Sequence, residues 1–277
     1  MILWQNPYLN KSILLPSRTP SKSFSDLVEI VEILRKECPW DREQSHESLK
    51  DLMVEELYEA IDAIDKKDFN ELKKELGDLL LHVVFHAVMA NEESHFKMED
   101  VIWGIQDKLI RRHPHVFEAL KVSGTAEVLK NWEQIKMKEG GRKSVLEGVP
   151  NQLPGLLRAQ RMQEKASGVG FDWGNFEDCW LKVEEELGEF KETIQGKSQD
   201  ERNKEFGDLI FAIVNSGRHL NINAEDALRL TNNKFKSRFE HIEKRVSEQG
   251  KHMKDYNLQQ LDLFWDEAKA LEKQNAL

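Results

Sequence analysis

The sequence contains only two cysteines, Cys38 and Cys179, among its 277 residues. Neither belongs to a CxxC pair or has a histidine at metal-ligand spacing, which argues against a disulfide framework or a structural zinc site and predicts a reducing, cytoplasmic location. Long apolar runs are also missing. The longest, Leu79 to Phe85, is interrupted by His82 and is far shorter than the roughly 20 residues that cross a bilayer. We therefore expect no membrane anchor.

Positive charge is outnumbered by negative charge. Forty lysines and arginines stand against 50 aspartates and glutamates, which gives a formal net charge of −10. An acidic surface repels phosphate backbones, and no block of basic residues offsets this, so we expect no nucleic acid partner. The 39% hydrophobic and 32% charged residues predict a soluble protein with a buried core.

Proline and glycine are concentrated in two segments. Residues 1–23 hold three of the seven prolines and predict a flexible arm rather than a targeting segment. Residues 139–154 hold three glycines and the last two prolines, which predicts a linker. In residues 24–138 and 155–277, apolar side chains recur at three- and four-residue spacing, with little of the alternation typical of strands. We therefore predict an all-α chain with two helical domains.

The second domain repeats an acidic pattern of the first. Five acids recur 130 residues later: Glu55, Glu56, Glu59, Glu75 and Asp78 reappear as Glu185, Glu186, Glu189, Glu205 and Asp208. Three further residues also have counterparts, at offsets of 126, 126 and 133: Lys108, Arg112 and Trp132 match Lys234, Arg238 and Trp265. We interpret this pattern as a tandem duplication of one helical domain.

The spacing of the acids predicts that they meet across a helical hairpin. A helix turns about 100° per residue, so acids three apart point within about 60° of each other. Antiparallel packing of two such helices, with turns at residues 65–68 and 196–199, would gather four carboxylates in each domain. The second-domain set is Glu186, Glu189, Glu205 and Asp208, and the first-domain set is Glu56, Glu59, Glu75 and Asp78.

Such a cluster requires a cation. Carboxylates about 4 Å apart repel by on the order of 4 kcal/mol per pair at an effective dielectric near 20. Oxygen ligands without sulfur favour Mg²⁺, with Mn²⁺ as a substitute, and Mg²⁺ commonly takes substrate phosphates as further ligands. We therefore predict a phosphate ester or anhydride as substrate and water as the nucleophile. Glu185 and Glu186 are the predicted catalytic pair; Glu185, like Glu55, either orients the water or simply faces solvent.

Other interpretations of these residues remain open. A single EExxE motif is ordinary helix surface, and its repetition in one register is what favours a site. His82 and His86 occur in the first domain alone, and we interpret them as packed or hydrogen-bonded rather than as ligands. A di-iron bundle site requires two ExxH motifs, and only the segment from Glu92 to His95 fits, in a predicted loop. Lys234 and Arg238 suit a polyphosphate and Trp265 a stacked base, although such residues usually face solvent or pack.

Several motifs together identify a family resemblance. In the first domain they are Cys38-Pro-Trp-Asp41, Glu55-Glu-Leu-Tyr-Glu59, Glu75-Leu-Gly-Asp78 and Arg111-Arg-His-Pro-His-Val-Phe117. In the second domain they are Val169-Gly-Phe-Asp-Trp173, Glu205-Phe-Gly-Asp208 and Asn233-Lys-Phe235. From Phe24 to its C-terminus, the chain resembles the MazG family of nucleoside triphosphate pyrophosphohydrolases in its long, two-domain form.

The resemblance implies tandem MazG-like helical bundle domains, a homodimer, and Mg²⁺-dependent hydrolysis of NTPs and dNTPs to monophosphate and pyrophosphate by attack at the α-phosphorus. It also implies metal ligands at the four second-domain acids. Glu201 departs from this pattern, because a two-domain relative has lysine there. Nucleotide contacts are implied at Lys182, Val183, Glu184, Glu185, Glu186, Glu201, Arg202, Asn203, Lys204, Asp208, Lys234, Phe235, Lys236, Ser237, Arg238 and Trp265.

The function predicted from sequence is therefore clearance of nucleotides by pyrophosphohydrolysis. The resemblance places activity mainly in the second domain, while the five acids of the first domain leave it as a second site or as a regulatory and dimerisation domain. Two alternatives stay open: a non-catalytic helical module that binds a nucleotide or an unknown protein partner, and a pyrophosphatase dedicated to dUTP or dCTP.

Overall fold

The computed structural model describes residues 18–118, 120–125, 127, 128, 131, 132, 135 and 144–275. Residues 1–17 of the predicted arm and residues 139–143 of the predicted linker lie outside this range. Throughout the described part the regular structure is helical and contains no strand, which confirms the all-α prediction. Contacts between Cα atoms divide the chain between Lys121 and Val122 into an N-terminal and a C-terminal unit.

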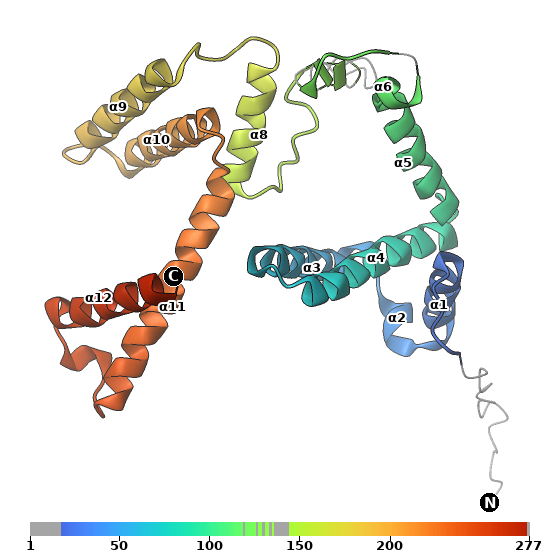
Figure 1. Ribbon diagram of the computed structural model, residues 1–277, viewed down its shortest axis with the longest axis horizontal. Helices are drawn as coiled ribbons and strands as arrows, with labels where there is room; N and C mark the ends of the chain where they lie inside the picture. The colour runs from blue at the N-terminus through green and yellow to red at the C-terminus, as the bar shows by residue number, and fades with distance from the viewer. Residues whose placement is uncertain are drawn as a thin grey trace, which may run out of the picture. The chain divides into compact units, whose positions relative to one another are not determined.

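The N-terminal unit is built around a helical hairpin (Figure 1). Its turn has Lys67 in the left-handed region at φ 55° and Asp68 as the N-cap of the second helix, accepting hydrogen bonds from two backbone N–H groups. The predicted turn at residues 65–68 is therefore confirmed. The helices are α1 (Phe24–Glu37), α2 (Pro39–Glu43), α3 (His46–Lys66), α4 (Phe69–Glu92), α5 (Met98–Arg112) and α6 (Pro114–Phe117).

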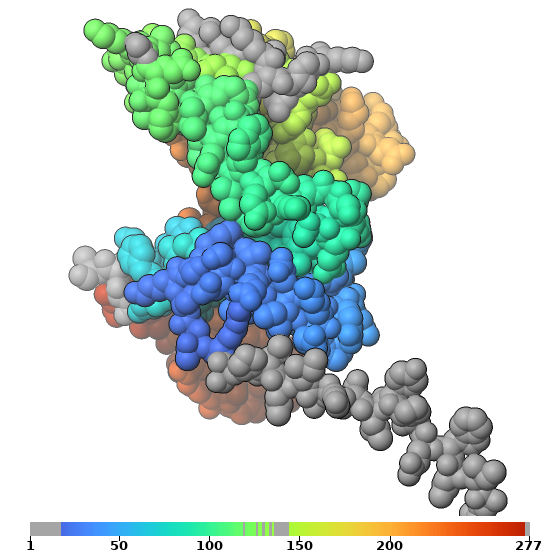
Figure 2. Space-filling model, turned by 90° about the vertical axis from the view of Figure 1, so that its right-hand side faces the viewer, coloured from blue at the N-terminus to red at the C-terminus, as the bar shows by residue number. Residues whose placement is uncertain are grey.

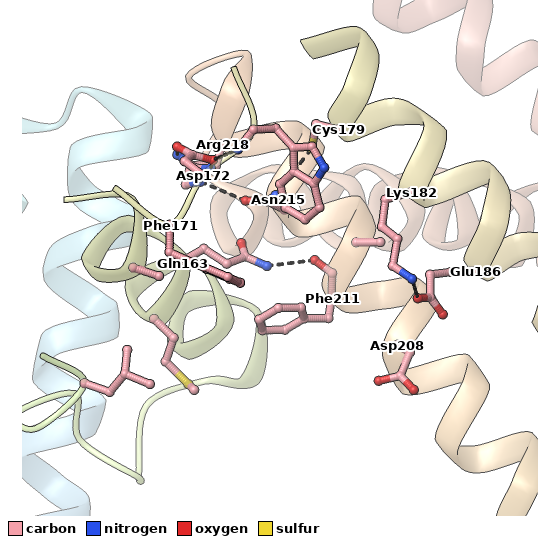
Figure 3. Close-up of a pocket in the computed structure, with 15 residues that line it drawn as sticks. Gln163, Phe171, Asp172, Cys179, Lys182, Glu186, Asp208, Phe211, Asn215 and Arg218 are labelled. Carbon is pink, nitrogen blue, oxygen red and sulfur yellow. Dashed lines mark hydrogen bonds and ion pairs between the residues drawn. The ribbon is translucent and has the colours of Figure 1, made fainter. Parts of the chain in front are cut away.

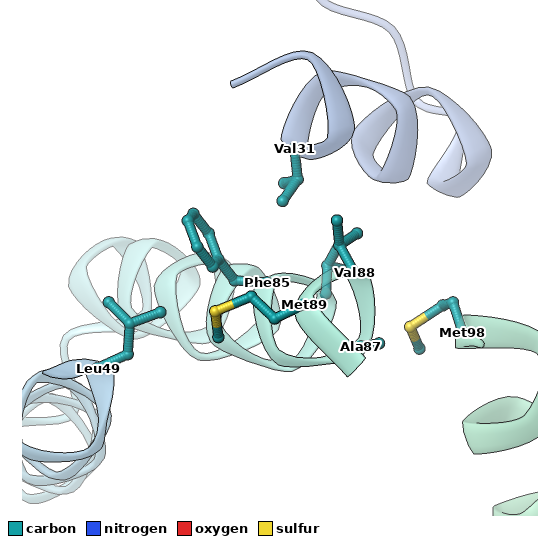
Figure 4. Packing of buried hydrophobic residues seen from close by; sticks show 8 residues of the cluster. Val31, Leu49, Phe85, Ala87, Val88, Met89 and Met98 are labelled. Carbon is teal, nitrogen blue, oxygen red and sulfur yellow. The ribbon is translucent and has the colours of Figure 1, made fainter. Parts of the chain in front are cut away.

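The core of the N-terminal unit lies around the second half of α4. Val31 of α1 and Leu49 of α3 pack there against Phe85 and Val88, and Met98 of α5 joins them (Figure 4). Figure 2 shows the surface that α1 and α5 present on one side of this unit. This apolar cluster lies at one end of the hairpin, and the acidic residues near the turn do not belong to it.

The C-terminal unit contains a second hairpin of the same kind, formed by α9 and α10. Gly196 in its turn has a φ of +80°, and Ser198 caps α10 together with Glu201, which confirms the predicted turn at residues 196–199. Helix α8 packs against α10 and α11, and α12 folds back along α11 (Figure 1). The elements are α8 (Gly155–Ser167), α9 (Phe176–Thr193), α10 (Gln199–His219), α11 (Ala224–Glu248), η1 (Met253–Asp255) and α12 (Leu258–Asn275).

Within the described ranges, every helix is too short or too polar to span a bilayer.

Candidate metal and nucleotide site

Three carboxylates meet across the α9–α10 hairpin. Glu186 comes from α9, and Glu205 and Asp208 lie one turn apart on α10; one oxygen from each is within 4.8 Å of the others. Glu186 is only 6% exposed, and its Oε2 atom is buried without a hydrogen-bond partner in the described structure. A buried, unpaired carboxylate oxygen beside two other carboxylates suits a hard cation such as Mg²⁺.

The fourth predicted ligand, Glu189, lies at the edge of this cluster. The pKa of Glu189 is raised, mainly by the negative charge of Glu186 and then by burial and the charge of Glu205. A hydrogen bond between the side chains of Glu189 and Glu205 acts in the same direction. The structure therefore brings all four predicted second-domain acids together, with Glu189 outside the tightest trio.

Lys182 compensates the negative charge at one side of the cluster. Its Nζ atom lies 2.6 Å from Glu186 Oε1 and 2.8 Å from Glu185 Oε1. Hydrogen bonds with Glu185 and Glu186 raise the pKa of Lys182, so the ammonium stays charged. Glu185 is exposed, with its side chain at 57% relative accessibility, so its carboxylate is reachable from solvent.

The N-terminal hairpin assembles the corresponding first-domain acids. One oxygen each from Glu56, Glu75 and Asp78 lies within 4.8 Å of the others. Burial, followed by the charge of Glu59, raises the pKa of Glu75 to about 7. Glu55 and Glu59 line an adjoining groove of about 580 Å³. The duplication has therefore kept the geometry of the acids as well as their spacing.

A cavity of about 390 Å³ adjoins the acid cluster of the C-terminal unit. Lys182, Glu186 and Asp208 lie at one side, whereas Gln163 and Phe171 lie at the other (Figure 3). The remaining lining is largely apolar: Leu146, Met162, Ala166, Trp173, Cys179, Phe211 and Ala212, with Asp172, Asn215 and Arg218. A mostly apolar pocket with a few placed polar groups is typical of small-molecule sites.

The loop between α8 and α9 is fixed to α10 by a salt bridge. Arg218 donates to Asp172 through Nη1 at 3.0 Å and Nη2 at 2.5 Å. Burial alone would raise the pKa of Asp172, but hydrogen bonds from Arg218 and Ser167 outweigh it and lower the pKa to about 2. Arg218 Nε also donates to Asn215 Oδ1, and Asn215 Nδ2 donates to Cys179 Sγ. No motif in the sequence marks Gln163, Asn215 or Arg218 as residues of a site.

A difference between the two halves would have revealed this pocket. In the register of the acids, the residues 130 positions before Cys179, Lys182, Asn215 and Arg218 are Leu49, Leu52, Phe85 and Val88. Leu49, Phe85 and Val88 are buried in the N-terminal core (Figure 4). Buried apolar side chains therefore occupy the positions of the N-terminal unit that correspond to Cys179, Asn215 and Arg218 of the cavity lining.

Residues predicted around the hairpin turn have local structural partners. Val183 is buried against Leu209 and Ala212, so its side chain packs in the core of the hairpin. Glu201 caps α10 through Ser198, and Arg202 donates to the carbonyl oxygens of Thr193 and Lys197. Lys204 Nζ lies 3.3 Å from Glu205 Oε1. The Asn203 side chain accepts a hydrogen bond from Gln199, and the Glu184 carboxylate accepts one from Trp180.

The predicted nucleotide contacts on α11 and α12 lie apart from the acids. Arg238 donates hydrogen bonds of 2.6 and 3.1 Å to the Glu272 carboxylate. Its guanidinium lies 5.2 Å from the centre of the Trp265 ring, and that ring also contacts Phe235. Lys234, Lys236 and Ser237 are exposed on α11. These six residues neither line the cavity nor belong to the acid cluster. Figure 1 shows α12 beside the half of α11 that points away from α9 and α10.

The two histidines singled out in the sequence, His82 and His86, are packed or hydrogen-bonded, as predicted. His86 Nδ1 lies 2.7 Å from Nδ1 of His46, and the two rings are stacked. His82 is buried. Neither belongs to a metal-type cluster of the described residues.

Comparison with known proteins identifies the domain. The family model of the MazG nucleotide pyrophosphohydrolase domain matches twice, at residues 44–117 and 175–243. The "Nucleoside triphosphate pyrophosphohydrolase/pyrophosphatase MazG" of Thermotoga maritima is 46% identical over 89% of this chain and 95% of its own length. The "Nucleoside triphosphate pyrophosphohydrolase" of Escherichia coli K12 is 42% identical over 85% of this chain and 91% of its own length.

A crystal structure of a mazG-related protein from Thermotoga maritima is 29% identical, covers 41% of this chain and 98% of that one, and has a TM-score of 0.37. The two domain matches contain both acid clusters, and the two full-length relatives span most of the chain. The protein therefore belongs to the MazG nucleotide pyrophosphohydrolase family and carries two copies of its domain.

Proposed function

We propose that the protein hydrolyses nucleoside triphosphates to nucleoside monophosphate and pyrophosphate. The observation that carries this proposal is the direct connection between the carboxylates Glu186 and Asp208 and a cavity of about 390 Å³ with an apolar end. A nucleotide has the same two parts, an anionic phosphate chain and a base with apolar faces. The names of the Thermotoga maritima and Escherichia coli relatives support the same reaction.

The cation would be Mg²⁺, with Mn²⁺ as a substitute. It would be held by Glu186, Glu205 and Asp208, with Glu189 beside them. When bound, it supplies positive charge to the phosphoryl oxygens and favours ionisation of water. Glu185 is exposed next to this trio and accepts the proton of the attacking water. The water oxygen bonds to the α-phosphorus while the bond to the bridging oxygen breaks, and pyrophosphate leaves. Lys182 moves from its ion pairs toward the phosphates, adding charge compensation.

We further propose that the protein works as a homodimer. Large apolar side chains are exposed on the hairpin of the C-terminal unit, including Leu181, Phe206 and Ile213, each at least 49% accessible. Exposed apolar surface of this kind typically marks an interface. A second copy would also bring its Lys234, Arg238 and Trp265 to the acid cluster from which the same residues of the first copy are separated.

The C-terminal unit is the nucleotide site in this proposal. The N-terminal unit has the acids but fills the adjoining pocket positions with Leu49, Phe85 and Val88, so it serves as a regulatory or dimerisation domain that binds a cation. Deoxynucleoside triphosphates are included as substrates, and the role in the cell is clearance of nucleotides from the cytoplasmic pool.

Product analysis tests this function. The purified protein is incubated with Mg²⁺ and a panel of NTPs and dNTPs, and monophosphate with pyrophosphate is resolved from diphosphate with phosphate. We expect the first pair of products, and we expect Glu186→Gln with Asp208→Asn to abolish them. The matched control, Glu56→Gln with Asp78→Asn, changes the equivalent N-terminal acids and should leave the products intact. Nucleotide binding without any product would instead identify a non-catalytic module.

A further inference from the structure

Gln163 lines the cavity and carries an unused hydrogen-bond acceptor. Its side chain is only 7% exposed, and its Nε2 atom donates to the carbonyl oxygen of Phe211 at 2.8 Å. Its Oε1 atom is buried and has no hydrogen-bond partner in the described structure. Figure 3 shows the amide nitrogen directed at Phe211 and the oxygen turned away from it. A buried acceptor without a partner is destabilising, and such a group calls for a ligand.

The orientation of this amide is fixed by its partner. Rotating the amide by half a turn would place Oε1 against the Phe211 oxygen, and two acceptors would then face each other. Two neighbouring polar side chains already have partners. Asn215 forms hydrogen bonds with Arg218 and Cys179, and Arg218 forms hydrogen bonds with Asp172, so Gln163 is the one available to a ligand. Two residues that line the cavity therefore carry a buried acceptor without a partner among the described residues: Glu186 at the acid side, with Oε2, and Gln163 at the other, with Oε1.

We propose that the far end of this cavity binds the nucleotide base and that Gln163 Oε1 selects bases that carry an exocyclic amino group at the position where adenine and cytosine have it. This inference rests on the proposed function and adds its base preference. Adenine and cytosine each present an amino donor on the pairing edge, whereas hypoxanthine and uracil present a carbonyl oxygen at the same position. An amino group satisfies Gln163, and a carbonyl oxygen opposes it. Phe171 and Trp173 supply the apolar and aromatic lining against which a base packs.

Selection by Gln163 leads to a difference between substrates that are otherwise alike. A site that hydrogen-bonds a substrate group strongly rejects an analogue lacking it, because the buried protein atom then stays unpaired. ATP and ITP differ in one amino or keto group of the purine, and CTP and UTP differ likewise in the pyrimidine. We therefore expect kcat/KM to be about tenfold or more higher for ATP than for ITP, and for CTP than for UTP.

The test measures kcat/KM for both nucleotide pairs in the full-length protein with Mg²⁺. Gln163→Met keeps the side chain length and removes the acceptor, so we expect the ATP-to-ITP and CTP-to-UTP ratios to fall close to one. Gln199→Met is the matched control, because Gln199 is exposed on α10 and bonds only to Asn203 among the partners described. The control should keep both ratios. Circular dichroism melting establishes that each variant is folded.

Binding separates failure of this inference from failure of the proposed function. Calorimetric titration of ATP and ITP reports base selection even if no nucleotide is hydrolysed. Tighter ATP binding that Gln163→Met equalises supports the base subsite, whether or not pyrophosphate is released. Equal turnover and equal binding of ATP and ITP by the unmodified protein overturn the inference, and this outcome requires no variant to fold. Ratios that Gln163→Met leaves unchanged overturn it as well.

Discussion

Arg218 of α10 holds Asp172 of the α8–α9 loop through two hydrogen bonds, of 3.0 and 2.5 Å. Both residues line the cavity next to the acid cluster. The pair therefore fixes the segment that carries Phe171 and Trp173 to the helix that carries Asp208, and it connects the stability of the fold to the shape of the site.

Asp172 is expected to give the stability a specific dependence on pH. Its folded pKa of about 2 lies below the ordinary 3.8, so the pair stabilises the folded state fully above the ordinary value and this stabilisation is lost as pH falls from 3.8 through about 2. A shift of this size corresponds to about 2 kcal/mol. Asp172→Asn should lower the free energy of unfolding by about this amount near neutral pH. Urea unfolding at several pH values checks this, and a deficit that stays constant down to pH about 2 would contradict it.

The acid clusters are expected to make stability depend on metal. A ligand that binds only the folded state adds about 2.7 kcal/mol at 100 times its dissociation constant. Mg²⁺ should therefore raise the melting temperature, and EDTA should reverse the rise. Glu186→Gln with Asp208→Asn should remove the contribution of the C-terminal unit, and Glu56→Gln with Asp78→Asn that of the N-terminal unit. An unchanged Mg²⁺ effect in the protein with all four substitutions would exclude these acids as ligands.

Filling the cavity should impair nucleotide use without unfolding the protein. Asn215→Phe introduces the residue that the N-terminal unit has at the same register position, Phe85. We expect kcat/KM for ATP to fall about tenfold or more, because the base loses its place and with it the alignment of the α-phosphorus. The matched change Phe85→Ala opens the N-terminal core instead and should cost about 3–5 kcal/mol of stability. Full activity in folded Asn215→Phe would place the nucleotide elsewhere.

The sequence predicted the acid clusters well because their signal is local and repeated. Helical spacing sets the direction of Glu186, Glu205 and Asp208, and the turn residues Asp68 and Ser198 set the hairpins. The cavity gave no such signal. Gln163 reaches Phe211 from another helix, 48 positions away, and a glutamine within a helical pattern has no distinctive spacing. The informative feature was a difference between the two halves of the chain. The C-terminal half has polar residues at positions where the N-terminal half has buried apolar ones.

Substitution of Glu201 tests whether this residue has a structural role or binds the nucleotide. The family resemblance implies a nucleotide contact, whereas in the structure its carboxylate accepts from the Ser198 N–H and hydroxyl groups and closes the capping box of α10. We expect Glu201→Ala to lower the melting temperature slightly and to leave KM for ATP unchanged. Ser198→Ala, which removes the other half of the box, should cost about 0.5–2 kcal/mol and also leave KM unchanged. A large rise in KM for Glu201→Ala alone would instead support a nucleotide contact at Glu201.

The separation of Arg238 from the acids leads to a test of how two copies cooperate. If the site combines the acids of one copy with Arg238 and Trp265 of the other, Glu186→Gln and Arg238→Ala are each inactive alone but complement each other when co-expressed. A mixed dimer then has one site with both changes and one site with neither. Random pairing makes half of the dimers mixed, so about a quarter of the unmodified activity should return. If the acids and Arg238 of the same copy form each site, every site in the mixture carries one change and no activity returns, which would contradict the shared-site dimer.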